Sequence, residues 1–536
     1  MNRKSLVLLS FSLFTLAVLL IGCKKKISKI ANTGWNPNIA VPIGEATFEM
    51  SDLIVNIDST FEVNSLGEIS INYEENLDSV LASDFFTLDD YTENFDLTPP
   101  GLVPVPIFPN GEEFTNSTTI STSYSAPAGT EINTLNFNSG NLVLTLTSTF
   151  QHDATFSVTL PDLIKNGSPI TRTINLNYLG SPTTTQSISI DLTDVAADFT
   201  AGGTLANSIR ASIDATITST GTPGNPIVGN EELHLDLSLN NLEYKNITGY
   251  FGQEVLTSAT DSLLLKIFQS ANNQGSLSFS NPTLTFNIEN SFGVPININL
   301  GTFYSIDSIT GQSHSLVISP SAINVNTPAN MGQSASTSIV MNKNNTTNID
   351  KIFNVNPRYL AYNLSATTNP AGNTGNLNFI ESTSMMKIRA NLHLPFEGSA
   401  SGISASDTLE YSLDNDIDLL ESVMLRLDVN NGFPVSFNAQ ITFVDENYNT
   451  VFTLFDTPTR VINGALVNNA TGKVTSSVQK VTDVKLSSEK VNLLRQVKHI
   501  IVNGIVSTTD PQNTNVKLYD SYNIAIKLGI QVTLKN

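Results

Sequence analysis

The sequence predicts an all-β protein: three tandem antiparallel β-sandwich modules of about 140 residues that follow an N-terminal β-rich region. Three observations support this prediction. Apolar and polar residues alternate along much of the chain, helical periodicity is rare, and two sequence landmarks recur at nearly constant spacing. At 536 residues the chain is also too long for a single hydrophobic core.

Alternating runs mark the strands. The clearest are NLVLTLTSTF (141–150), LHLDLSLNNL (233–242), LTFNIEN (284–290) and NIAIKLGIQVTL (523–534). Because successive side chains of a strand point to opposite faces of a sheet, these runs predict sheets with one buried and one solvent-facing side. Two such sheets packed face to face satisfy this pattern.

Only two segments favour a helix. They are DSLLLKIFQSA (261–271) and SSEKVNLLRQV (487–497), the second with Ser487 or Ser488 as a candidate N-cap.

The repeat rests on one phenylalanine and one proline per module. Each phenylalanine follows a strand and a small or polar pair, and each proline follows a later strand that ends in Thr or Ser. The residues are Phe150, Phe292 and Phe433, spaced 142 and 141 apart, and Pro223, Pro370 and Pro511, spaced 147 and 141 apart. We expect the phenylalanines to fill the core at a strand bend and the prolines to lie in turns.

These landmarks divide the chain into segments, and each module is expected to hold its own core. The expected segments are a signal peptide (1–22), a lipidated N-terminal region and spacer (23–117), and three modules (118–250, 251–398 and 399–536). Within the N-terminal region, the proline-rich stretch 98–111 favours an extended spacer.

The N-terminus has the three parts of a secretory signal: Arg3 and Lys4, an apolar run, and a small residue before the only cysteine. Leu20-Ile21-Gly22-Cys23 resembles the bacterial lipobox. This resemblance implies cleavage before Cys23 and its acylation, with palmitate as a typical chain. Several acyl chains anchor a protein stably, whereas one does not. The alternative is an ordinary signal peptide that contains a cysteine.

The residues after Cys23 bear on localisation. Lys24 replaces the aspartate that often retains such lipoproteins at the inner membrane, so the resemblance favours the outer membrane and leaves its periplasmic or cell-surface face open. The lysines at 24–26 either contact anionic head groups or belong to a solvated tether. The net charge of −21 makes nucleic acid a poor partner.

A search for chemistry yields no catalytic residue and no cofactor site. The chain has no G-x-S-x-G, H-E-x-x-H or phosphate-binding glycine-rich loop, and its five histidines are scattered. Asp414, Asp416 and Asp418 are weak metal candidates because they place carboxylates at alternate positions, but a calcium loop also needs glycine where Leu419 stands. A solvated turn is the alternative.

A second modification pattern is D-[S/T]-aliphatic, which resembles an O-glycosylation motif of the Bacteroidota. The candidate acceptors are Ser59, Ser79, Ser262, Ser308 and Thr408.

Two longer segments carry family resemblances. NPTLTFNIENSFGVPININL (281–300) is similar to the core of the LEA14/WHy domain, a fibronectin-like sandwich that is generally non-catalytic. GWNPNIAVPIGEATFEMSDLI (34–54) resembles the start of large uncharacterised outer-membrane lipoproteins of the Bacteroidota.

We therefore expect a lipid-anchored outer-membrane protein, not an enzyme, that binds or scaffolds an envelope protein or glycan. The alternatives are an accessory subunit of an outer-membrane barrel complex, for assembly or transport, and a secreted hydrolase whose carboxylate pair leaves no motif.

Overall fold

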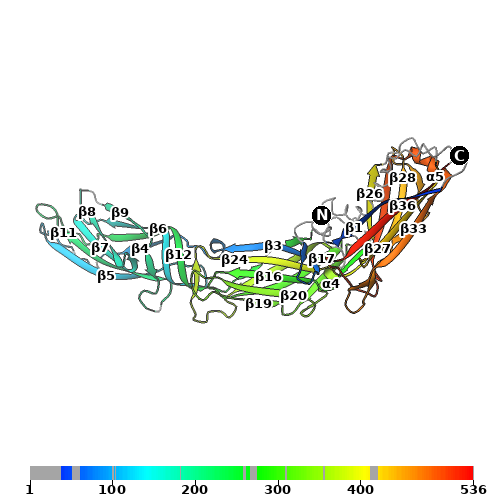
Figure 1. Ribbon diagram of the computed structural model, residues 1–536. Coiled ribbons are helices and arrows are strands. Elements are labelled where there is room, and N and C mark those ends of the chain that lie inside the picture. The colour runs from blue at the N-terminus through cyan, green and yellow to red at the C-terminus, as the bar shows by residue number, and fades with distance from the viewer. Residues whose placement is uncertain are drawn as a thin grey trace.

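The computed structural model describes residues 38–50, 61–98, 102, 104–180, 183–203, 205–257, 261–265, 275–307, 311–353, 357–410 and 420–534. It shows three antiparallel β-sandwiches in a row, which confirms the predicted fold class. Module 1 lies at one end of an elongated molecule, module 2 in the middle and module 3 at the other end (Figure 1).

The same pairing recurs in every module. The strand that ends before the repeated phenylalanine pairs with a late strand of the module in one sheet, and the strand that follows this phenylalanine pairs with another late strand in the second sheet. The central pairs are β6–β12 and β7–β11 in module 1, β16–β24 and β17–β22 in module 2, and β27–β36 and β28–β34 in module 3.

In module 1 the sheets run β4(Tyr91–Asp96)-β12(Leu233–Phe251)-β6(Thr130–Ser148)-β9(Thr184–Asp191) and β5(Glu113–Ser123)-β11(Ser208–Thr218)-β7(Asp153–Lys165)-β8(Ser168–Leu176), with β10(Ala196–Asp198) between β6 and β7.

In module 2 they run β3(Ile69–Leu81)-β24(Met385–Pro395)-β16(Thr283–Asn290)-β20(Ala335–Met341), with β2(Phe61–Val63) beside β3, and β22(Pro357–Thr368)-β17(Ile296–Asp307)-β18(Ser313–Ile318)-β21(Thr346–Thr347), with β13(Val255–Thr257) and β14(Asp261–Leu264) beside β22 and β19(Ala322–Val325) beside β17.

In module 3 they run β1(Asn38–Glu49)-β36(Asn523–Leu534)-β27(Leu420–Asn431)-β33(Val478–Leu486) and β26(Ile403–Glu410)-β34(His499–Thr508)-β28(Val435–Val444)-β29(Thr450–Thr453), with β30(Thr459–Ile462) beside β28 and a small hairpin β31(Leu466–Val467)–β32(Val474–Ser476).

The N-terminal segment 38–96 contributes strands to all three modules, in reverse order. β1 pairs with β36 of module 3, β3 with β24 of module 2, and β4 with β12 of module 1. The predicted separate N-terminal region (23–117) is therefore wrong for the described residues. The predicted boundary at 117/118 also falls inside β5, an integral strand of module 1.

The repeated phenylalanine sits in the same turn in all three modules. Two residues before it, a buried side chain accepts a hydrogen bond from its backbone N–H. The bonds join Phe150 to Ser148 Oγ (3.1 Å), Phe292 to Asn290 Oδ1 (3.0 Å) and Phe433 to Asn431 Oδ1 (2.9 Å). Phe150 and Phe292 are fully buried, as predicted. Phe433 is only half-buried, so the core prediction is wrong there.

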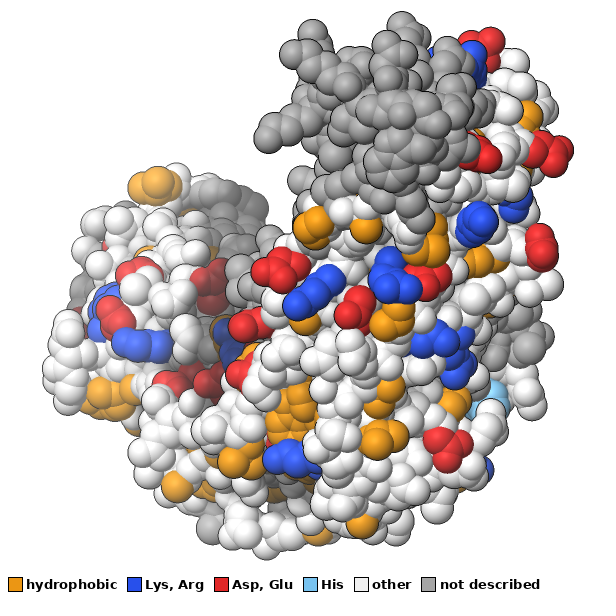
Figure 2. Space-filling view, turned by 45° about the vertical axis from the view of Figure 1, so that its right-hand side comes forward, with side chains coloured by type: hydrophobic (Ala, Val, Ile, Leu, Met, Phe, Trp, Pro, Cys, Tyr) orange, Lys and Arg blue, Asp and Glu red, His pale blue; other side chains and the backbone are white. Residues whose placement is uncertain are grey.

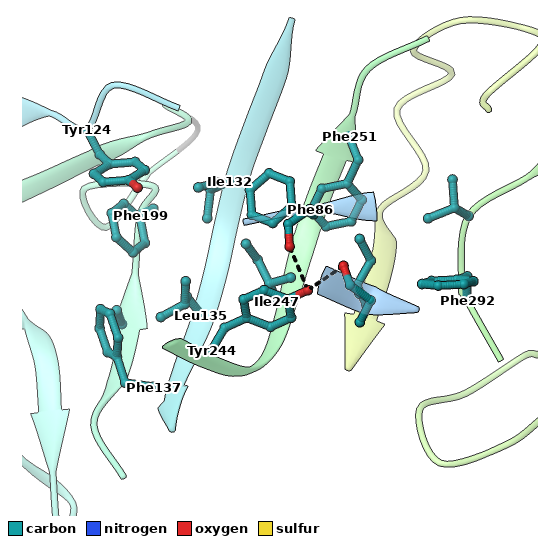
Figure 3. Packing of buried hydrophobic residues seen from close by; sticks show 14 of the residues in the cluster. Phe86, Tyr124, Ile132, Leu135, Phe137, Phe199, Tyr244, Ile247, Phe251 and Phe292 are labelled. Carbon is teal, nitrogen blue, oxygen red and sulfur yellow. Dashed lines mark hydrogen bonds between the residues drawn. The ribbon is translucent and has the colours of Figure 1, made fainter. Parts of the chain in front are cut away.

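Modules 1 and 2 share one continuous core, which corrects the expectation of separate cores. The short helix α3(Ala82–Phe85) of the N-terminal segment lies at their junction. Phe86 packs against Tyr244 and Phe251, and the Tyr244 hydroxyl donates to the carbonyl oxygens of Ala82 (3.3 Å) and Phe86 (3.1 Å) (Figure 3). Phe85 stacks on Phe292 of module 2 at 5.2 Å. β23(Asn378–Glu381) of module 2 extends the sheet of module 1 by pairing with β12.

Modules 2 and 3 meet around a three-stranded sheet, β15(Ser276–Phe279)-β25(Glu397–Ser401)-β35(Val516–Lys517). The N-terminal segment joins this contact too, because Ile69 N donates to Leu518 O and Asp520 N to Gly67 O. Lys517 Nζ lies 3.6 Å from Glu68 and 3.2 Å from Glu397.

The helical predictions gave mixed results. α5(Ser488–Leu493) begins after Ser487, whose side chain accepts from Lys490 N, and a 3-10 turn, η4(Leu494–Gln496), follows. A third short helix, α4(Ile349–Phe353), was not predicted. The helix predicted for 261–271 is wrong where it is described, because β14 occupies 261–264 as a strand beside β22.

Candidate functional site

The end of module 1 that points away from module 2 is formed by four loops, 97–112, 149–152, 177–183 and 219–232, which follow β4, β6, β8 and β11. We call the described residues of these loops the distal tip. It lies at the far left of the molecule in Figure 1, at the opposite end from module 3.

Two loops of the distal tip, 97–112 and 219–232, are fixed to one another. Val105 and Ile227 exchange two backbone hydrogen bonds, with N–O distances of 2.7 and 2.9 Å. Ser219 Oγ donates to Phe108 O at 2.5 Å, and Phe108 is buried. Gly224 is required here, since a Cβ at that position would lie 1.6 Å from Phe108 O. The spacer predicted for 98–111 is thus wrong over 104–111, which packs onto the module.

Beneath these loops lie two buried ionisable groups. Glu231 accepts hydrogen bonds from Val228 N (2.5 Å) and Gly229 N (2.7 Å). His152 Nδ1 accepts from Thr220 N at 3.2 Å, and the His152 ring meets Phe108 edge to face. Burial lowers the pKa of His152, so the ring is neutral at neutral pH. At 2% and 5% exposure, His152 and Glu231 hold the loops and are closed to a substrate.

The surface of the distal tip is apolar and acidic. Leu179 is 90% exposed, Ile107 59% and Val228 57%. The four loops contain three glutamates, two of them exposed, and neither lysine nor arginine. By contrast, the face of the molecule shown in Figure 2 carries both acidic and basic side chains, interspersed with hydrophobic ones. The tip therefore combines large apolar side chains, one sign of charge and a fixed backbone.

The modification sites predicted from sequence are not brought together. Cys23, Ser59, Ser308, Asp414, Asp416 and Asp418 lie outside the described residues. Ser79 on β3, Ser262 on β14 and Thr408 on β26 are exposed and belong to different sheets. Glycosylation of these exposed residues stays a prediction.

No metal site or histidine cluster is found within the described ranges. None of their His, Cys, Asp and Glu side chains form a group of three that could hold a metal ion. His393 contacts Asn72 in module 2, His499 stacks on Tyr448 in module 3, and His234 lies 3.4 Å from Glu232 in module 1. These histidines thus have separate local partners.

Module 3 contains an apolar cavity between its sheets, lined by β27, β28, β30, β33 and β36. Its volume of about 40 Å³ holds only a few water-sized groups. We therefore do not assign it a ligand. Among the described helices, none has the length and apolar character needed to cross a membrane.

Comparisons with known proteins leave the family open. No family model matches the chain, and no curated protein is significantly similar to it. A secreted protein from Parabacteroides distasonis is 14% identical, with 54% of this chain and 89% of that chain covered and a TM-score of 0.32. A tandem CBM22 domain of Paenibacillus barcinonensis Xyn10C is 8% identical, with 55% and 96% covered and a TM-score of 0.13. Both likenesses are too distant to support a function.

Proposed function

We propose that the protein is a lipid-anchored, non-catalytic binding protein of the outer membrane, whose distal tip contacts a protein of the cell envelope. The observation that carries this proposal is the distal tip itself. Ile107 and Val228 are exposed on two loops that backbone hydrogen bonds hold together, so little conformational entropy is lost there when a partner binds, and Leu179 adds a third exposed apolar side chain.

A protein partner is favoured over a glycan for a physical reason. Aliphatic side chains gain free energy by burial against apolar surface, about 25 cal/mol per Å², and an acidic rim attracts a basic one. Of the aromatic side chains in the described tip, Phe108 and Phe150 are buried and Tyr178 is half-buried, so the exposed apolar surface is mainly aliphatic, whereas sugars stack on exposed aromatic rings. A barrel protein of the outer membrane is one partner of this class.

The proposed anchor would place the distal tip far from the membrane. Cys23 lies 15 residues before Asn38, which pairs with Thr533 at the free end of module 3. A chain of this length reaches at most about 50 Å. The described chain therefore begins at module 3, and modules 2 and 1 extend away from it.

The anchor is tested by Cys23→Ala. We expect this variant to leave the membrane fraction, because nothing else in the mature chain is expected to hold it there. A Cys23→Ala protein that stays in the membrane fraction in high salt contradicts the lipid anchor.

The binding role is tested by recovering the protein from detergent-solubilised membranes with its partners. Ile107→Asp should abolish stoichiometric recovery of the partner. Leu377→Asp is the matched control, because Leu377 is also 59% exposed but lies in module 2. A screen against envelope polysaccharides and peptides accompanies this experiment, and turnover that one Asp or Glu substitution abolishes would overturn the non-catalytic role.

A further inference from the structure

One edge strand of module 1 lacks the features that usually prevent strands from pairing between molecules. Edge strands are protected by proline, bulges or charges. β1 carries Pro42 and a register shift, and the middle of β26 carries Asp407. β5, by contrast, runs for 11 residues as EFTNSTTISTS, with its only charge at the first residue and an unbroken register against β11.

The open side of β5 presents a regular set of backbone groups. Among the described strands, β5 pairs with β11 alone. Tyr124 N donates to Asn207 O and Ser219 N to Glu112 O at the two ends of this ladder, so the even-numbered residues of β5 bond to β11. The odd-numbered residues direct their N–H and C=O groups outward. They are Glu113, Thr115, Ser117, Thr119, Ser121 and Ser123.

The inner face of β5 is also incompletely covered. Phe114 faces the sandwich interior yet remains 42% exposed, and Ile120 is half-buried. On the adjacent strand, Ile213 and Ile217 are buried, at 1% and 2% exposure. One further strand beside β5 would cover Phe114 and Ile120, in the same way that β5 covers Ile213 and Ile217 of β11.

We propose that this strand is β5 of a second copy of the chain, paired antiparallel about Thr118. In this register outward-facing residues meet outward-facing residues, which a two-fold axis requires. Ser117 lies opposite Thr119 of the second copy, and Thr115 opposite Ser121, so hydroxyls face hydroxyls. Glu113 lies opposite Ser123, so the acidic chain brings no like charges together at this edge.

The pairing fixes the shape of the dimer. The strands of module 1 run along the long axis of the molecule (Figure 1), so antiparallel β5 strands direct the two copies of module 3 away from each other. If the anchor proposed above holds, such a dimer joins copies attached to two facing membranes. The dimer itself does not depend on the anchor.

The first test uses the single cysteine of the sequence. In the full chain with Cys23→Ser, Thr118→Cys introduces the only thiol. In a non-hydrogen-bonded antiparallel pair the two Cα atoms lie about 4.5 Å apart, a separation that a disulfide spans. We expect mild oxidation to convert this variant to a covalent dimer. Ser406→Cys, on the corresponding edge strand of module 3, is the control and should form no covalent dimer.

The second test separates pairing from folding. Ser117→Pro, in the full chain with Cys23→Ser, removes an outward N–H and leaves the hydrogen bonds between β5 and β11 intact. Sedimentation of this variant should therefore show half the mass found for the chain without Ser117→Pro. Ser117→Ala should remain dimeric. The proposal is overturned if the unsubstituted chain sediments as a monomer, if Ser117→Pro stays dimeric, or if Thr118→Cys and Ser406→Cys crosslink equally.

Discussion

Asn290 and Asn431 occupy equivalent positions in modules 2 and 3, and each satisfies several backbone groups at once. Asn290 Nδ2 donates to Phe292 O (3.3 Å) and Asn326 O (3.1 Å), and Asn431 Nδ2 donates to Val435 O (2.9 Å) and Asn463 O (2.7 Å). Both side chains are almost fully buried. Alternation in the sequence predicted a strand up to each asparagine, but the turn depends on side-chain bonds that alternation does not encode.

The first prediction follows from these bonds. Asn290→Ala should lower the free energy of unfolding by about 1–3 kcal/mol, because it leaves buried backbone groups without partners. Denaturant unfolding of the full chain measures the loss. Asn287→Ala, on the exposed face of the same strand, is the control, and equal losses for the two variants would contradict the assigned role.

The second prediction concerns the repeated phenylalanine. Phe292→Ala should cost about 3–5 kcal/mol because it opens a cavity in a closed core. Phe433→Ala should cost clearly less, since Phe433 is half-buried and contacts Tyr522 at the edge of module 3. Thermal unfolding of both variants checks this order, and a larger loss for Phe433→Ala would reverse the interpretation.

At the scale of elements, the sequence predicted the strands and their repetition better than their partners. The alternating runs at 233–242 and 523–534 lie within β12 and β36. The sequence did not predict that β4 and β1 would complete their sheets, because pairing between strands more than 130 residues apart leaves no local signal. The same limit explains the wrong prediction of a separate N-terminal region.

The third prediction tests the contribution of β1. The fragment 399–536 alone should aggregate or fold poorly, because without β1 the edge of β36 is open and Phe48 is missing from the nearby apolar cluster. Linking residues 38–49 to the fragment should restore a soluble, cooperatively unfolding β protein. A fragment that unfolds cooperatively and with equal stability without β1 would show that the strand is dispensable.

The fourth prediction concerns Glu68 at the junction of modules 2 and 3. A hydrogen bond from the Asn64 side chain, with Lys517 nearby, lowers the pKa of Glu68 below its usual 4.5. Because the folded pKa is lowered, the stabilisation is complete above pH 4.5 and is lost as pH falls through the folded pKa. The protection of the backbone amides of Ile69 and Leu518 from hydrogen exchange, relative to their intrinsic exchange rates, should decrease in this pH range. In Glu68→Gln this pH-dependent loss of protection should disappear. If the pH profile of protection is the same in Glu68→Gln as in the unsubstituted protein, Glu68 is not the cause of the loss.

At the scale of the whole molecule, the N-terminal segment runs along all three modules, and a later strand of each module pairs with it. Contacts at both junctions include this segment, through Phe85 and Phe86 at one and Glu68 at the other. The distal tip and Asn38, the first described residue, lie at opposite ends of the molecule. Sequence alone did not indicate the tip, because the proline-rich stretch gave no sign of the Val105–Ile227 contact that fixes it.

The central proposal is that the distal tip contacts another protein of the envelope. It is tested most directly by photo-crosslinking in intact membranes, with a photoreactive residue at Ile107 or at the equally exposed Leu377. We predict that position 107 crosslinks to one defined envelope protein and that position 377 does not. Crosslinking to the same protein from both positions, or from neither, would contradict the claim.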